Sequence, residues 1–285
     1  MALNYKTLVT RSLSGAVFVV LLLGSLLWNY VSFSAFFFLV SMLALGEFYK
    51  IAEKLNTRPY KATGFILAIL IYVSVLRIDY FVGPETFSYR YFNLLMLCLT
   101  FVVAAVAMFS KREQPLHNAL FTVFGIVYAV LPFCILHRLV VFSGPVVAGA
   151  VYNPWQLFSV IILIWSNDTL AYLGGSLFGR HKMIERISPG KTWEGTLTGI
   201  ALTTPISYFL KSDFGGDNDS MRWIFYGVLV PILATIGDLV ESMIKRQAGV
   251  KDSGSIMPGH GGALDRFDSL IFVTPFVLVI NSVIS

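Results

Sequence analysis

The charged residues that could do chemistry gather in one stretch of this 285-residue chain, residues 242–268, which reads SMIKRQAGVKDSGSIMPGHGGALDRFD. Only 13% of the chain is charged. Glycines in the stretch interrupt any helix and let backbone N–H groups approach a ligand closely. Bases neutralise a polyphosphate, carboxylates hold its metal, and amides contact its oxygens, so the mixture suits a metal-bound polyphosphate. Asp265 and Asp268 are three residues apart at the start of an apolar run, which places both on one helical face.

A second chemical region lies upstream, where residues 188–195 read SPGKTWEG. Pro189 and Gly190 predict a tight phosphate-holding turn, in which Lys191 brings charge and the hydroxyls of Ser188 and Thr192 donate. The turn also begins a helix, whose N-terminal amides favour an anion. The alternative is that this segment only caps the helix. The spacing excludes a nucleotide P-loop.

Ionisable residues inside apolar runs form the third feature. One run carries a polar stripe with three- and four-residue steps, made of Asp238, Glu241, Ser242 and Lys245. Asp238 is seven residues from Lys245, which is about 10 Å along a helix. Intramembrane charges usually face a polar cavity, so we interpret Asp238 as functional, and Glu241 either as functional or as the partner of Lys245. For Asp168, a structural hydrogen bond to a neighbouring helix and a functional role stay open.

The order of these residues resembles the signature of the phosphatidate cytidylyltransferases, also called CDP-diacylglycerol synthases. The matching positions are Ser242, Lys245, Arg246, Lys251, Asp252, His260, Gly261, Gly262, Asp265, Arg266, Phe267 and Asp268. Residues 188–195 resemble a second family stretch, although Gly190 stands where the family usually has a Lys. The specific resemblance starts at Trp165, and the N-terminal half is similar only in hydropathy.

The resemblance implies transfer of the cytidylyl group of CTP to phosphatidate, which gives CDP-diacylglycerol and pyrophosphate for phospholipid biosynthesis. It implies Mg²⁺ as cofactor, with a second cation as an alternative, and CTP, phosphatidate and the lipid bilayer as partners. No nucleic acid is expected, and a homodimer is compatible with the resemblance. The implied catalytic residues are Asp265, Asp268, Lys251 and Arg266, and the implied metal ligands are Asp238, Asp265 and Asp268. The implied substrate-binding residues are Ser188, Lys191, Thr192, Asp168, Ser242, Lys245, Arg246, Asp252, His260, Gly261 and Gly262.

Composition predicts a polytopic membrane protein rather than a soluble one, because 56% of the residues are hydrophobic and the mean hydropathy is +0.74. Helices need about 20 mostly apolar residues to cross a bilayer. We therefore expect an all-α protein with about nine spans. The first run lacks a clear cleavage site, so we expect a retained anchor. The predicted spans cover residues 12–28, 31–53, 62–82, 90–109, 117–143, 155–178, 193–211, 222–247 and 265–284.

Two domains follow from this division of the chain. Residues 1–153 would form the N-terminal membrane helices, and residues 154–285 the catalytic membrane region with cytoplasmic loops 179–192 and 248–264. Pro132 predicts a break in the fifth span. Cys98 and Cys134 lie inside apolar runs, so no disulfide framework is expected.

Lysines and arginines predict the orientation. Sixteen of them lie at the N-terminus and in the even-numbered connections, against four on the other side. The positive-inside rule places the N-terminus and the 242–268 stretch on the cytoplasmic side, where CTP is available. A bacterial inner (plasma) membrane is the expected location. Asp213, Asp217 and Asp219 would lie on the opposite side, as a solvated loop or a cation site outside the active site.

Two other function classes compete with this interpretation. A cation-coupled transporter would usually show repeated halves, whereas the polar residues here gather in the last four spans. The second class is a related CTP-using enzyme, either a polyprenol or lipid kinase, which would transfer the γ-phosphoryl group instead, or a cytidylyltransferase for another lipid phosphate. A CDP-alcohol phosphotransferase is disfavoured, because its Asp-Gly-x2-Ala-Arg motif is absent.

Overall fold

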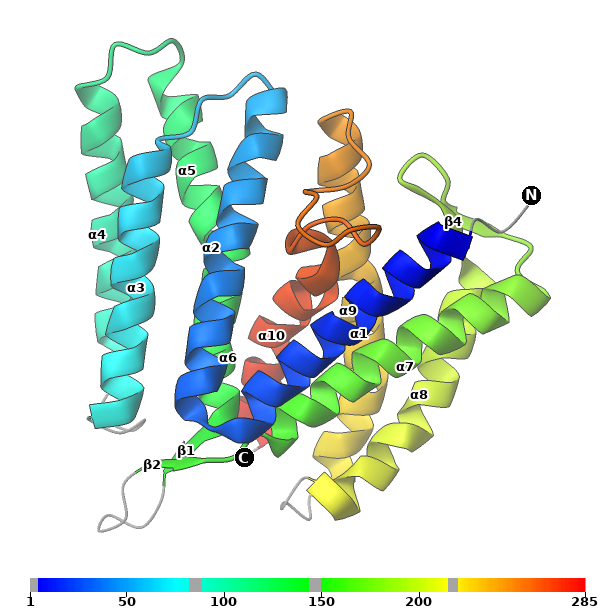
Figure 1. Cartoon of the computed structure of the whole chain (residues 1–285). Coiled ribbons are helices and arrows are strands. Elements are labelled where there is room, and N and C mark those ends of the chain that lie inside the picture. Colours follow the sequence, from blue (N-terminus) through cyan, green and yellow to red (C-terminus); the bar gives the residue numbers. More distant parts are fainter. Residues whose placement is uncertain (1–4, 82–88, 144–149, 215–219, 285) are drawn as a thin grey trace. The chain divides into compact units, whose positions relative to one another are not determined.

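Helices dominate the computed structural model of the chain (Figure 1), which describes residues 5–81, 89–143, 150–214 and 220–284. The described residues form two compact units. Unit 1 contains residues 1–152 and 247–266, and unit 2 contains residues 153–246 and 267–285. Segment 247–266, which carries most of the signature, therefore belongs to the same unit as the N-terminal helices.

Unit 1 is built from six helices and one hairpin among its described residues. The helices are α1 (Tyr5–Trp28), α2 (Tyr30–Lys54), α3 (Lys61–Phe81), α4 (Tyr89–Met108), α5 (Pro115–Ala129) and α6 (Leu131–Val140), and the hairpin pairs β1 (Val141–Ser143) with β2 (Ala150–Tyr152). Asn29 separates α1 from α2 and accepts a hydrogen bond from the Ser32 N–H in a capping box. The predicted break in the fifth span is confirmed, because α5 ends one residue before Val130 and Pro132 lies in the first turn of α6.

Aromatic side chains fill the core of unit 1. Phe33, Phe37 and Phe133 are fully buried, and Tyr72 packs edge-on against the buried ring of His137. Such rings bury large apolar areas and prefer tilted or edge-on contacts. The core thus fixes α2, α3 and α6 against one another.

The described part of unit 2 contains four helices and a second hairpin. Its elements are α7 (Trp155–Phe178), β3 (Lys182–Ile184), β4 (Ser188–Thr192), α8 (Trp193–Phe214), α9 (Ser220–Gln247) and α10 (Leu264–Ile284), with the ends of α9 and α10 next to segment 247–266 assigned to unit 1. Strands β3 and β4 pair antiparallel. The predicted helix boundaries agree with these elements to within a few residues, except at the start of α1.

Six described helical segments are long and apolar enough to cross a membrane: Val9–Trp28, Tyr30–Lys54, Pro115–Val140, Trp155–Phe178, Ser220–Gln247 and Leu264–Val283. Shorter apolar stretches occur in α3 and α4. The all-α, polytopic membrane fold is confirmed, with two small hairpins added to it. The count of about nine spans stays a prediction. Asp217 and Asp219 of the predicted acidic cluster lie outside the described residues.

Candidate active site

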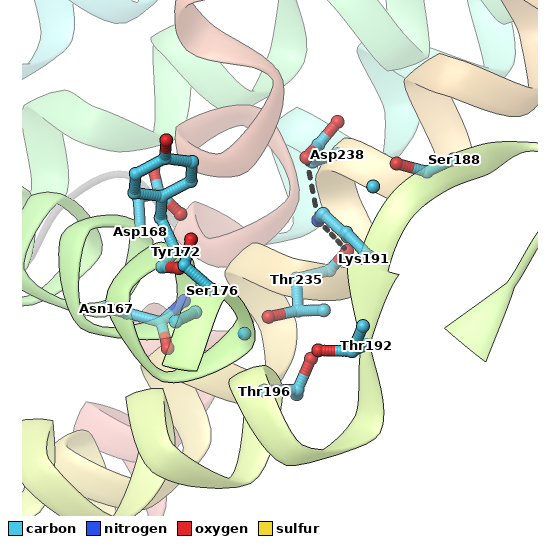
Figure 2. A pocket seen from close by; sticks show the side chains of 13 residues that line it. Asn167, Asp168, Tyr172, Ser176, Ser188, Lys191, Thr192, Thr196, Thr235 and Asp238 are labelled. Carbon is cyan, nitrogen blue, oxygen red and sulfur yellow. Dashed lines mark hydrogen bonds and ion pairs between the residues drawn. The ribbon is translucent and has the colours of Figure 1, made fainter. Parts of the chain in front are cut away.

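A polar cavity of about 370 Å³ opens within unit 2 (Figure 2). Its walls come from α7, β4, the start of α8 and the middle of α9. Five residues predicted from sequence line it: Asp168, Ser188, Lys191, Thr192 and Asp238. Further polar groups come from Asn167, Tyr172, Ser176, Thr196 and Thr235. Most of the polar groups that line the cavity are therefore hydroxyls, together with one cation and two carboxylates.

Close packing of α7 against α8 positions two of these walls. A Cβ atom on Gly195 would lie 2.6 Å from the Ala171 carbonyl oxygen and 2.9 Å from the Cα of Gly175. Only glycine allows the two backbones to approach so closely. Asp168 and Tyr172 on α7 therefore lie on the same cavity as Thr192 and Thr196 at the start of α8.

The hairpin β3–β4 brings Ser188 and Lys191 to the cavity. The tight turn predicted for residues 188–192 is wrong, because these residues form an extended strand paired with β3. Pro189 has no N–H to donate, which an edge strand tolerates. At the strand's end, Thr192 caps α8 by accepting the Gly195 N–H at 3.2 Å. The capping alternative is thus confirmed for Thr192, whose hydroxyl also lines the cavity.

Lys191 makes the central ion pair of the cavity. Its Nζ lies 2.6 Å from Oδ2 of Asp238 and donates to the Thr235 carbonyl at 3.3 Å, as Figure 2 shows with dashed lines. An ammonium group has three donors, so two contacts leave capacity for a third acceptor. The Ser242 hydroxyl donates to the other carboxylate oxygen of Asp238 at 3.2 Å.

Three carboxylates meet where α9 faces α10. Asp238, Glu241 and Asp268 each offer an oxygen, and these oxygens lie within 4.8 Å of one another. Gly237 allows the approach, since a Cβ there would lie 2.7 Å from the Cβ of Phe272 and 2.8 Å from the Asp268 carbonyl oxygen. Like charges this close repel each other. Oxygen ligands of this kind are what Mg²⁺ prefers, so the donor set fits a hard divalent cation.

Cations on α9 continue the polar stripe. Lys245 Nζ pairs with Glu241 Oε2 at 2.5 Å, which confirms the predicted partnership. Arg246 donates from Nε to the Ile187 carbonyl at 3.3 Å, next to β4. The polar stripe therefore runs from the three carboxylates to the base of the β3–β4 hairpin.

The remaining predicted residues lie in segment 247–266 of unit 1 (orange in Figure 1). A tight turn forms there, in which Met257 and Gly261 pair and Gly261 adopts φ +81°. His260 Nδ1 lies 2.8 Å from the Ser14 hydroxyl of α1. Burial lowers the pKa of His260, and the positive charges of Arg266 and Arg11 lower it further. His260 is therefore expected to be neutral near pH 7.

Asp265 contacts the backbone of its own loop. Its Oδ2 accepts the Ser253 N–H at 2.8 Å, the Ser253 hydroxyl at 2.9 Å and the Gly262 N–H at 2.8 Å. A metal bound by Asp265 would have to use Oδ1 or displace these hydrogen bonds. Lys251, Asp252 and Arg266, on either side of this network, are exposed.

The predicted site residues thus fall into two groups. Unit 2 brings together Asp168, Ser188, Lys191, Thr192, Asp238, Ser242, Lys245, Arg246 and Asp268, whereas unit 1 holds Lys251, Asp252, His260, Gly261, Gly262, Asp265 and Arg266. Two residues were missed: Glu241 as a member of the carboxylate group, and Glu47, which contacts the loop from α2. An acid six residues inside the C-terminal end of the apolar second span was the signal for Glu47.

Comparison with known proteins adds the family. The model of a cytidylyltransferase family matches residues 9–284. A phosphatidate cytidylyltransferase of Staphylococcus haemolyticus is 29% identical over 275 residues, which cover 95% of this chain and 97% of that protein. One from Staphylococcus aureus is 35% identical over 193 residues, covering 66% and 69%. One from Haemophilus influenzae is 41% identical over 124 residues, but the match spans only 42% of this chain and 43% of that protein.

These matches extend beyond the C-terminal signature, because the family model begins in α1 and the Staphylococcus haemolyticus relative aligns along almost the whole chain. The N-terminal helices are therefore part of the same family pattern as the cavity and the loop. The chain belongs to the cytidylyltransferase family.

Proposed function

We propose that the protein transfers the cytidylyl group of CTP to phosphatidate, giving CDP-diacylglycerol and pyrophosphate. The observation that carries the proposal is the unit 2 cavity, in which Lys191, Asp238 and several hydroxyls converge beside the carboxylates of Glu241 and Asp268. A phosphate oxygen of the lipid would attack the α-phosphorus of CTP in line, and pyrophosphate would leave. The relatives' names and the family match support the substrates.

The negative charge of both substrates determines which kinds of residue the reaction needs. A phosphomonoester has its second pKa near 6, so the lipid nucleophile is already an anion at neutral pH. No general base is required. The activation barrier comes largely from the repulsion between the two negatively charged substrates. Preorganised cations lower this barrier by neutralising their charge. Lys191 would contact phosphate oxygens through its remaining donor, while Ser188 and Thr192 would orient the phosphate chain through their hydroxyls.

We propose Asp238 and Asp268 as ligands of Mg²⁺, with Glu241 as the third carboxylate of the group and Asp265 as a further predicted ligand. Bound there, Mg²⁺ would supply positive charge to the phosphate oxygens. The signature residues Lys251, Arg266, Asp252 and His260 are proposed to bind CTP, as the family resemblance implies. A second cation and a homodimer stay predictions.

The cytoplasmic face of a bacterial inner (plasma) membrane is the proposed location of the site. The excess of lysine and arginine on one side supports this orientation. CTP is a cytoplasmic metabolite, whereas the acyl chains of phosphatidate stay among the helices. A membrane-embedded cavity open to the cytoplasm would serve both substrates.

Labelled CTP tests the transferred group. Purified protein with phosphatidate and Mg²⁺ should move label from the α-phosphate of CTP into lipid. Label at the γ-phosphate should appear only in pyrophosphate. Transfer of γ-label into lipid would instead make the protein a CTP-dependent lipid kinase, and no transfer of either label would contradict both activities.

A further inference from the structure

Glu47 is a buried carboxylate in the C-terminal half of α2, with 3% of its surface exposed. A charge removed from water is costly unless hydrogen bonds compensate for it. Its hydrogen-bond partners Ser253, Ala263 and Leu264 lie in segment 247–266, more than 200 residues further along the chain. The acid therefore has a tertiary role that its own helix does not explain.

Both carboxylate oxygens of Glu47 accept hydrogen bonds from the loop and from the first turn of α10. Oε1 accepts the Ala263 N–H at 3.0 Å, and Oε2 accepts the Leu264 N–H at 2.9 Å and lies 2.9 Å from the Ser253 hydroxyl. The first N–H groups of a helix have no partner within the helix. An anion at a helix N-terminus is also favoured by the helix dipole. Glu47 thus caps α10 from a distant helix.

Ser253 joins Glu47 to Asp265. Its hydroxyl lies 2.9 Å from a carboxylate oxygen of each, and its N–H donates to Asp265. The loop fits tightly, because a Cβ atom on Gly254 or on Gly262 would clash with the Glu47 carboxylate. The two ends of residues 253–264 are therefore held close to each other by hydrogen bonds to Glu47 and Asp265. Lys251 precedes the network by two residues, and Arg266 follows it directly.

We infer that Glu47 is a positioning residue for cytidylyl transfer: it holds residues 253–264 in the conformation that presents Lys251, Asp265 and Arg266. The inference rests on the proposed function. Glu47 would act through the loop rather than by contact with a substrate. A displacement of reacting groups by 1 Å can cost about 10²-fold in rate, so a small movement of the loop is enough to matter.

Glu47→Gln tests this directly. The amide keeps the size of the side chain but turns one acceptor into a donor, which would face either the Ala263 N–H or the Leu264 N–H. We expect kcat to fall by about 10-fold to 10²-fold, with a much smaller change in KM for CTP. The matched control is Glu53→Gln on the same helix, whose carboxylate makes a half-exposed pair with Lys61 and should leave kcat unchanged.

A second variant perturbs the loop and leaves the acid in place. Gly254→Ala would push the loop away from Glu47. Its control is Gly24→Ala on α1, because a Cβ atom there would meet nothing within 4 Å. Combining Glu47→Gln with Gly254→Ala should cost little more than either change alone, because both break one contact. Full additivity of the two losses would contradict the inference.

A readout independent of activity is the rate at which a thiol reagent labels Ala263→Cys, a buried position next to Glu47, in a background where Cys98 and Cys134 are alanine. Glu47→Gln and Gly254→Ala should speed labelling, while the two control changes should not. Wild-type kcat and unchanged labelling in folded Glu47→Gln and Gly254→Ala would overturn the inference. If the parent protein transfers no cytidylyl group, the proposed function fails, and the labelling rates still decide whether Glu47 holds the loop.

Discussion

The carboxylates of the two units have opposite surroundings. In unit 2, Asp238, Glu241 and Asp268 bring their oxygens within 4.8 Å of one another. In unit 1, Glu47 and Asp265 accept backbone N–H groups of residues 253, 262, 263 and 264. Like charges in contact destabilise a fold unless a cation joins them, whereas a carboxylate that accepts N–H groups stabilises the backbone around it. The same residue type thus suits ligand binding in one unit and loop positioning in the other.

If both regions serve one reaction, they must face the same side of the membrane. Cysteines placed at Ser255 in the loop and at Glu185 in the β3–β4 hairpin, both exposed, should react with an impermeant reagent only from the cytoplasmic side. A cysteine at Val151, also exposed, should react only from the other side. This effect is all-or-none. Labelling of Ser255→Cys and Glu185→Cys from opposite sides would break the link between the two regions.

Asp268→Asn and Asp265→Asn should separate the two kinds of carboxylate. Asp268→Asn should lower activity by about 10²-fold or more, because one well-placed electrostatic contact in a transition state contributes about 2.7–4 kcal/mol. Without added metal its melting temperature should rise, because Lys191 and Lys245 already pair with Asp238 and Glu241, and the charge of Asp268 is repelled by both of these carboxylates. Asp265→Asn should lower the melting temperature, because the loop loses a charged acceptor.

The same two variants also respond differently to added metal. Excess Mg²⁺ or Mn²⁺ should partly restore Asp268→Asn, and imidazole should not, because no proton need be removed. Activity measured against Mg²⁺ concentration, with melting curves in a metal chelator, provides the check. Near-normal turnover of Asp268→Asn, or its rescue by imidazole, would show that the carboxylate group does not hold the metal.

The smallest expected effect concerns His260 in the loop. Its lowered pKa means that the folded protein binds this proton less readily than the unfolded chain does. The stability that the neutral ring contributes is therefore present above the unfolded pKa, about 6.5, and is lost as pH falls below it. His260→Gln should flatten the fall in melting temperature between pH 7 and pH 5 slightly. An activity profile that shifts with this substitution between pH 6 and pH 8 would instead indicate a charged His260 at the substrate.

Sequence reasoning predicted the helices and the cavity residues better than the loop. Apolar runs locate a span because burial in lipid demands continuous hydrophobicity, and α7 begins and ends as predicted. The three- and four-residue steps of Asp238, Glu241 and Lys245 follow from helical geometry alone, so the stripe and the Lys245–Glu241 pair were predictable. The tight turn at residues 188–192 was wrong, because pairing with β3 overrode the local preference of Pro189 and Gly190.

The sequence by itself determined the membrane class, the break before Pro132, and the family pattern from Ser188 to Asp268, because these depend on composition and on spacing along one chain. Tertiary structure decided which acids meet. Glu47 lies 206 residues from Ser253, and no periodicity within α2 reveals a partner so distant. Asp268 joins Asp238 and Glu241 only because α9 and α10 approach closely at Gly237. Side-chain spacing defines the face of one helix, but the packing of separate helices decides what that face contacts.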